Sequence, residues 1–289
     1  MPSATDTCLQ QALAYQQAGR LTDALRLYEQ VLASEPSNAR ALNFAGTAYV
    51  QFGEVARAVE LLKRATAAEP NYAEAYHNLG VVLRDTGRLE EAAAAYRRML
   101  EIVPNDAEGY NDLGIVLRKM GKAAAAKEAY RHAIDLRPDY ADVYYNLGNV
   151  LLSEDKVEEA IQSYQRAVGL KSGDPRLYRM LGIALQSRGE LDEAVMNYRR
   201  AVDIDSNYAP AYANLASALV EKGDVLTGVE YFRHAVQLDP ESVHAHAGLG
   251  VALHDSGDIQ RALAEYDVCL TLDPGNTRAL AYKIGRAHV

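Results

Sequence analysis

The amino-acid sequence predicts an all-α solenoid built from 34-residue helix–turn–helix repeats. Three observations predict it: a marker residue that recurs every 34 residues, helical spacing of apolar residues in both halves of the repeat, and a glycine between the halves. A chain of similar small units buries its apolar faces only by stacking neighbouring units. The markers are Pro36, Pro70, Pro104, Pro138, Ser172, Ser206, Pro240 and Pro274.

When the marker residue is placed at position 32, its recurrence divides almost the whole chain into 34-residue repeats. Residues 1–4 then form an N-terminal tail, and residues 277–283 begin a ninth repeat or a capping helix. The eight predicted repeats are 5–38, 39–72, 73–106, 107–140, 141–174, 175–208, 209–242 and 243–276.

The last six residues, 284–289, leave the repeat pattern, because position 8 of a ninth repeat would be Ile284. The sequence Ile-Gly-Arg-Ala-His-Val is also what a common sequencing-library adapter encodes. We therefore expect residues 284–289 to be a non-native, adapter-derived tail and the natural protein to continue. A natural short tail is the alternative.

Each half of the repeat predicts one helix. In repeat 73–106 the apolar and small residues fall at i, i+3, i+4 and i+7, which is one face of an α-helix. They are Tyr76, Leu79, Gly80 and Leu83 in the first half, and Leu89, Ala92, Ala93 and Tyr96 in the second.

A turn residue at position 15 separates the two helices. Gly87 occupies it in repeat 73–106, and glycine takes the left-handed conformation that commonly ends a helix. Only Asp155 departs from glycine at this position in the eight repeats. Aspartate tolerates that conformation better than most residues, so we expect the same turn there.

Small residues at positions 8 and 20 predict that the two helices approach closely. A glycine inside a helix costs roughly 1 kcal/mol relative to alanine, so its recurrence at position 8 indicates packing that offsets the loss. Tyrosines at positions 4 and 24 are the bulky partners. A tyrosine stripe also suits stacked bases or sugars, but at helical spacing in every repeat we interpret it as core. Position 24 carries Tyr28, Tyr96, Tyr130, Tyr164, Tyr198, Phe232 and Tyr266.

Composition and charge narrow the function classes. The formal net charge of −9 argues against general nucleic-acid or anionic-membrane binding, and no apolar run approaches the ~20 residues that span a bilayer. Cys8 and Cys269 lie near opposite ends of the solenoid, too far apart for a disulfide, which favours a reducing, cytoplasmic location. No catalytic residue, metal site or cofactor is predicted, and the oligomeric state stays open.

The repeat resembles the tetratricopeptide repeat over residues 5–276: Leu-Gly at positions 7–8, tyrosine near 4 and 24, alanine at 20 and proline at 32. Runs such as Ala75–Gly80, Val143–Gly148 and Ala211–Ala216 are similar to the superhelical arm of the O-linked N-acetylglucosamine transferases. The resemblance implies a right-handed superhelix whose first helices line a concave groove for an extended peptide or a partner helix. Positions 2, 5, 6, 9, 12 and 13 of the first helix would face that groove.

Position 6 carries a short polar ladder. An amide offers both a donor and an acceptor, so a row of amides can pair with a peptide backbone whatever its side chains. In the resembled transferase arm a comparable asparagine ladder holds peptide backbone. The alternative is that these side chains cap or bridge neighbouring helices. Met180 interrupts the ladder, whose members are Asn78, Asp112, Asn146 and Asn214.

Basic residues cluster in the groove positions of the middle repeats. Such a strip inside an acidic protein would favour binding of an acidic peptide. The plainer interpretation is that these residues form salt bridges on solvent-exposed faces of the helices. The residues are Arg84, Arg118, Lys119, Arg176 and Arg179.

The predicted function is a non-catalytic scaffold that binds a protein or peptide segment in its concave groove. A second hypothesis is that the chain is the N-terminal, substrate-recruiting arm of a longer enzyme, such as a glycosyltransferase or an oxygenase. The gene sequence after Lys283 would separate the two. A third, a homodimer joined through its convex face, would show as a doubled mass in solution.

Overall fold

The computed structural model describes residues 3–284, and within that range the only regular elements are seventeen helices joined by short turns. The chain divides into two units, Met1–Val143 and Tyr144–Val289, and the division falls inside α9 rather than in a linker. Residues 285–289 of the expected adapter-derived tail lie outside the described residues.

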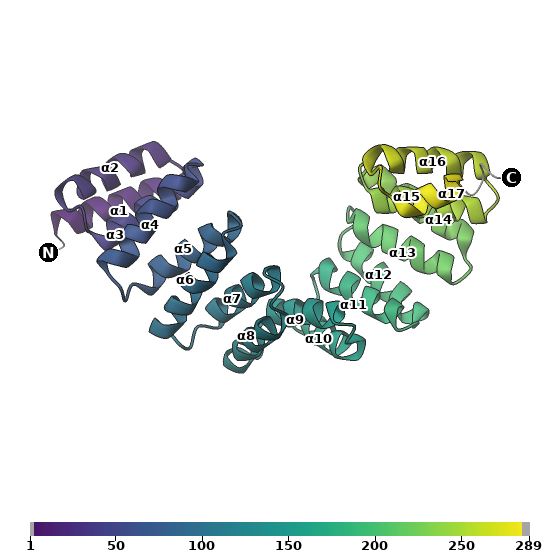
Figure 1. Ribbon diagram of the computed structural model, residues 1–289, viewed down its shortest axis with the longest axis horizontal. Coiled ribbons are helices and arrows are strands. Elements are labelled where there is room, and N and C mark those ends of the chain that lie inside the picture. Colours follow the sequence, from purple (N-terminus) through teal and green to yellow (C-terminus); the bar gives the residue numbers. More distant parts are fainter. Residues whose placement is uncertain (1–2, 285–289) are drawn as a thin grey trace. The chain divides into compact units, whose positions relative to one another are not determined.

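The first unit contains four helix pairs and the start of α9 (Figure 1). The helices are α1 Ala4–Gln17, α2 Leu21–Ser34, α3 Ala39–Phe52, α4 Val55–Ala68, α5 Ala73–Asp85, α6 Leu89–Ile102, α7 Ala107–Lys119 and α8 Ala123–Leu136. The first helix begins at Ala4 because Ser3 caps it: the Ser3 Oγ accepts a hydrogen bond from the Asp6 N–H at 3.0 Å. The helix thus takes in the last residue of the predicted tail.

The second unit continues the alternation from α9 to α17. Its helices are α9 Ala141–Ser153, α10 Val157–Leu170, α11 Pro175–Ser187, α12 Leu191–Ile204, α13 Ala209–Glu221, α14 Val225–Leu238, α15 Val243–Asp255, α16 Ile259–Leu272 and α17 Thr277–Ile284.

Each unit is a repeat solenoid, as the sequence predicts. Helices pack on their immediate successors, for example α5 on α6 and α6 on α7, and first helices also contact the first helix of the next repeat, as α3 contacts α5 and α13 contacts α15. Contacts are therefore confined to neighbouring repeats, which is the property that defines a solenoid.

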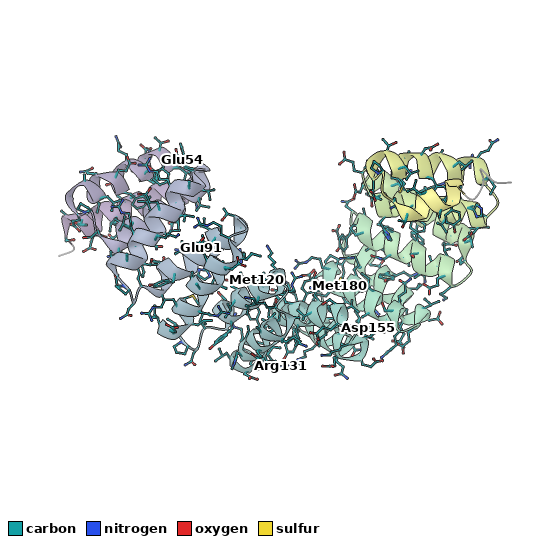
Figure 2. The ribbon with its side chains drawn as sticks, viewed as in Figure 1. Glu54, Glu91, Met120, Arg131, Asp155 and Met180 are labelled. Atoms are coloured by element: carbon teal, nitrogen blue, oxygen red, sulfur yellow. The ribbon has the colours of Figure 1, made fainter. Side chains whose placement is uncertain are left out.

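The turn within each repeat has the expected backbone. Seven glycines in the described range have positive φ, and they are the seven at position 15 of the repeat. Asp155, labelled in Figure 2, has φ of 60° and is the one described residue other than glycine in the left-handed region. The prediction for Asp155 is confirmed.

The core is built from the second-helix aromatic residues. Six of the seven tyrosine or phenylalanine rings at position 24 are at most 1% exposed, and Phe232 is 2% exposed. In five repeats the ring lies against the glycine at position 8: a Cβ on Gly114 would stand 2.4 Å from Cε1 of Tyr130, and one on Gly182 2.6 Å from Cε1 of Tyr198. The second-helix tyrosines are therefore core, as the sequence predicts. The first-helix tyrosines at position 4, such as Tyr76 and Tyr212, are only half-buried.

Candidate functional site

The candidate surface is the first-helix face, which we define as the surface carried by the odd-numbered helices of each unit. In the first unit these are α1, α3, α5 and α7, and in the second α11, α13, α15 and α17, with α9 carrying the ladder residue Asn146.

Asn78 bridges two first helices of the first unit. Its Nδ2 donates to Oδ1 of Asn43 on α3 at 2.9 Å. Asn43 is fully buried and donates in turn to the Tyr72 hydroxyl and to Glu74. One of the two N–H donors of the Asn78 amide is therefore already bonded within the protein, as the helix-bridging alternative expects.

Asp112 and Arg84 form a second bridge, between α5 and α7. Arg84 donates to Oδ1 of Asp112 at 3.2 Å, and His77 Nε2 lies 3.2 Å from Oδ2 of the same carboxylate. The hydrogen bond to Asp112 raises the pKa of His77 above its ordinary value, against the opposing effect of burial. Arg84 also pairs with Asp85 at 2.8 Å, so its charge is balanced by two carboxylates.

Arg118 and Lys119 are exposed at the end of α7. Arg118 lies close enough to the Tyr130 hydroxyl to lower its pKa, but burial dominates and raises that pKa to about 12. The Tyr130 hydroxyl is buried and has no hydrogen-bond partner among the described residues. In the first unit, Arg118 and Lys119 are therefore the residues of the predicted basic strip without a described carboxylate partner.

A glutamine at position 12 satisfies the hydroxyl of the core tyrosine, a role that the sequence pattern alone did not reveal. Where position 12 is glutamine, it accepts from the hydroxyl: Tyr28 donates to Gln16 and Tyr198 to Gln186, both at 2.9 Å. In repeat 141–174, where position 12 is Leu152, the Tyr164 hydroxyl donates instead to Asn149 at position 9, at 2.8 Å. In repeats 73–106 and 107–140 position 12 is arginine, which has no acceptor. The signal was present in the sequence as glutamine at this position in two repeats and arginine in two others.

In the second unit the two basic residues of the predicted strip, Arg176 and Arg179, form hydrogen bonds with neighbouring side chains. Arg176 pairs with Asp174 at 2.6 Å, and this arginine lowers the pKa of the buried Asp174 carboxyl. Arg179 donates to the Tyr208 hydroxyl at 2.8 Å and to Oδ1 of the ladder residue Asn214 at 3.4 Å. The ladder residue Asn146 is partly buried on α9.

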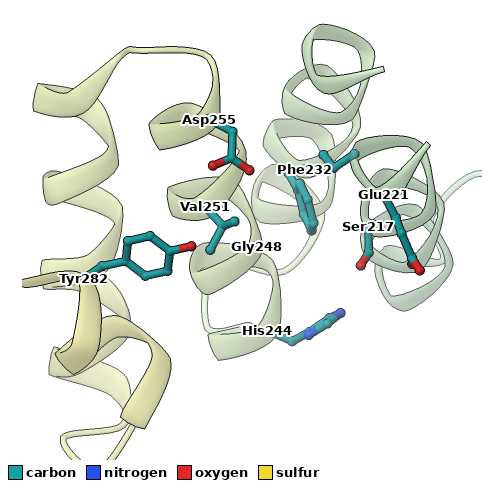
Figure 3. Close-up of a pocket in the computed structure, with 9 residues that line it drawn as sticks. Ser217, Glu221, Phe232, His244, Gly248, Val251, Asp255 and Tyr282 are labelled. Carbon is teal, nitrogen blue, oxygen red and sulfur yellow. The ribbon is translucent and has the colours of Figure 1, made fainter. Parts of the chain in front are cut away.

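A cavity of about 420 Å³ opens among α13, α14, α15 and α17 of the second unit. Figure 3 shows residues from these four helices around it. The repeat pattern did not predict this cavity, although seven of its nine lining residues occupy predicted groove positions of the eight repeats. They are Ser217, Val220, Glu221, His244, Gly248, Val251 and Asp255.

The described part of the chain contains neither a metal-binding cluster nor a membrane-spanning helix. Within residues 3–284 no group of three or more histidine, cysteine, aspartate or glutamate side chains is placed to hold a metal ion. No helix in that range is long and apolar enough to cross a membrane. Cys8 and Cys269 are both free thiols.

Sequence comparison decides the family. A tetratricopeptide repeat model matches residues 9–68, 45–107, 111–175 and 213–277, and a second TPR repeat model matches residues 184–223. The chain belongs to the tetratricopeptide repeat family. Proteins of this family are typically non-catalytic scaffolds for protein interactions, and the resemblance inferred from the repeat pattern is confirmed.

Solved structures agree with the family. The chain is similar to MamA, with 30% identity over 57% of this chain and 96% of MamA at a TM-score of 0.54. It is similar to YrrB, described as a TPR protein with an unusual peptide-binding site, with 24% identity over 66% of this chain and 98% of YrrB at a TM-score of 0.54. The Cut9–Hcn1 hetero-tetramer of the APC/C matches 96% of this chain and 55% of its own chain, with 17% identity and a TM-score of 0.66. No curated protein matches this tetratricopeptide repeat sequence.

Proposed function

We propose that this tetratricopeptide repeat protein is a non-catalytic scaffold that binds an extended peptide segment of a partner protein along its first-helix face. The observation that carries the proposal is the recurrence of partly exposed polar side chains at position 6, Asn78, Asp112, Asn146 and Asn214, above a core of closely packed tyrosines. Polar groups at a fixed period can pair with successive backbone amides of an extended chain. The peptide-binding site named for YrrB supports the same use of the fold.

The charges of the first unit favour an acidic segment there. Arg118 and Lys119 are exposed and lack a described carboxylate partner, whereas Arg84 is balanced by Asp85 and Asp112. Opposite charges across an interface speed association and select partners more than they raise affinity. We therefore expect salt to slow association with an acidic peptide.

A cytoplasmic location and a protein rather than nucleic-acid or membrane partner are part of the same proposal. The free thiols of Cys8 and Cys269 fit a reducing compartment. The net charge of −9 opposes attraction to nucleic acid and to anionic lipid surfaces.

The test is affinity for peptides selected from a display library of random 15-residue peptides against the whole chain. We expect Asn146→Ala combined with Asn214→Ala to weaken binding of a selected peptide roughly 5- to 150-fold, because two hydrogen bonds of about 0.5–1.5 kcal/mol each are lost. Asn78 is left intact, since its removal would deprive the buried Asn43 oxygen of its donor.

The matched control is Gln162→Ala combined with Gln165→Ala. Both glutamines are exposed on the second helix α10, so the control removes the same number of amides from the other helix class. Equal weakening by the two double variants, or no weakening by the first, would contradict the proposed function.

A further inference from the structure

The cavity of the second unit combines an apolar wall with an acidic rim. Val220, Phe232 and Val251 supply the apolar wall, and Glu221 and Asp255 supply two carboxylates. Figure 3 shows Phe232, Val251, Glu221 and Asp255 on neighbouring helices around the cavity. At about 420 Å³ the cavity has room for one long side chain.

At the cavity, repeat 209–242 lacks the glycine–tyrosine pairing that five of the eight repeats have. In repeat 209–242 position 8 is Ala216 and position 24 is Phe232. The Phe232 ring lies instead against Gly248 of the next repeat, where a Cβ would stand 2.3 Å from its Cε1.

Gly248 occupies position 6, the position at which four other repeats carry a ladder side chain. The Phe232 ring therefore occupies the space where a ladder side chain would begin, and no ladder side chain extends over the cavity from this position. The Phe232 ring is itself 2% exposed, so a side chain that enters from outside the protein meets the more exposed lining residues Val220, Glu221 and Asp255.

The two carboxylates carry an unbalanced negative charge. Glu221 is the last residue of α13 and Asp255 the last residue of α15, where the helix dipoles add further negative potential. Glu221 accepts a hydrogen bond from Gln186 at 2.7 Å. Neither carboxylate pairs with a described lysine or arginine: Lys222 pairs with Asp192, and Asp255 lies 3.6 Å from the ring of His254.

We propose that this cavity receives the basic side chain, of arginine or lysine, of an extended peptide segment. The inference rests on the proposed function, because the segment is the one that lies along the first-helix face. The aliphatic stem packs on Val220 and Val251, and the cationic head reaches the carboxylates of Glu221 and Asp255. A cation gains from charge-assisted hydrogen bonds to carboxylates. The partner segment is thereby specified as one with a basic residue at the position bound by the repeats at 209–276.

The experiment uses capped tripeptides, because they are too short to span several repeats. Acetyl-Ala-Arg-Ala-amide is titrated into the whole chain while the valine methyl signals are followed by NMR. We expect saturable shifts at Val220 and Val251, at least fivefold weaker binding of the peptide with norleucine in place of arginine, and weaker binding at high salt.

The variant is Glu221→Gln with Asp255→Asn, which keeps shape and removes charge. We expect it to weaken the arginine tripeptide roughly tenfold, which corresponds to about 1.4 kcal/mol. Its matched control is Asp203→Asn with Glu230→Gln, which removes two exposed carboxylates from the second helices α12 and α14. The control is expected to bind like the wild type.

Equal affinity for the norleucine tripeptide, unchanged affinity in the Glu221/Asp255 variant, or shifts that spare both valines would overturn the inference. Failure here is distinguishable from failure of the proposed function. Selected long peptides that bind while the arginine tripeptide does not would refute only the basic-side-chain cavity. A tripeptide that binds while no long peptide can be selected would refute only the extended-segment scaffold.

Discussion

Glycine at position 8 lets the tyrosine ring of the second helix pack directly against the first helix. The Tyr198 ring lies against Gly182 because no Cβ stands between ring and backbone, and the Tyr198 hydroxyl then reaches Gln186 at 2.9 Å. Protein interiors are packed closely enough that one added methyl group must displace its neighbours. The recurrence of glycine is thus a packing requirement rather than a requirement for backbone freedom.

We predict that Gly182→Ala is less stable than Gly169→Ala by roughly 1–3 kcal/mol. Both changes add a methyl group inside a helix, so both gain the same helix propensity of about 1 kcal/mol. A methyl group added at Gly169 would meet no atom within 4 Å, whereas one added at Gly182 would press on a buried ring. Urea unfolding of the two variants measures the difference, and equal stabilities would refute the packing argument.

We predict that Asp155→Gly stabilises the protein by up to about 1 kcal/mol. Asp155 holds φ at 60°, a conformation that costs an L-residue more than it costs glycine. The free energy of unfolding from urea denaturation is the measurement, with Asp155→Ala as the opposite control. A glycine variant no more stable than the alanine variant would show that no strain resides there.

At the residue scale, much of the fold and only part of the site could be predicted. Periodicity predicts the helices, the turns and the buried tyrosines because each is a property of one repeat. It does not tell which polar groups are already paired, since Arg84 meets Asp112, 28 residues away, in the next repeat. The cavity escaped prediction because it depends on where the Phe232 ring goes once Ala216 replaces the usual glycine.

At the element scale, the junction of α5 and α7 is held by a titratable bridge. His77 faces Asp112 on α7, with Arg84 on the same carboxylate and the Tyr96 ring 5.9 Å away, and Asp106 adds negative potential. The bridge joins the first helices of two successive repeats. The junction therefore couples helix packing to protonation.

We predict that this bridge contributes stability at acidic pH that is lost as pH rises. Because the pKa of His77 is raised in the folded protein, its contribution is fully present below the pKa of the unfolded chain and disappears as pH rises through the folded pKa. Wild type should exceed His77→Gln in free energy of unfolding at pH ~5.5 and approach it at pH ~8.5. The difference should stay below about 1 kcal/mol, because the imidazole is 36% exposed.

The control for this pH dependence is the same histidine change in an Asp112→Asn background. With the carboxylate gone, His77→Gln should produce little pH-dependent difference. A pH-dependent difference of undiminished size there would assign the effect to a group other than Asp112.

At the scale of the whole molecule, stability is set by repeats and by the interfaces between them. Six of the eight repeats have proline at position 32, whereas repeats 141–174 and 175–208 have Ser172 and Ser206 there. Asp205 before Ser206 is extended, with φ of −133° and ψ of 99°, which is the backbone that a following proline requires. The Ser206 site is thus compatible with the proline that the other repeats carry.

We predict that Ser206→Pro stabilises the protein by about 0.4–1 kcal/mol, because proline reduces the conformational freedom of the unfolded chain. Urea denaturation checks it, with Ser206→Ala as the control expected to change little. A destabilised proline variant would show that the turn backbone differs from that of the other repeats.

The central claim is that an extended peptide binds the first-helix face, and site-directed photo-crosslinking tests it most directly. A photoreactive residue is placed at Ile115 or Ile183 on the first helices α7 and α11, and in separate variants at the exposed Gln30 or Gln165 on the second helices α2 and α10. The account predicts that a display-selected peptide crosslinks from the first-helix positions and not from the second-helix positions. Crosslinks from Gln30 or Gln165 in place of Ile115 and Ile183 would contradict it.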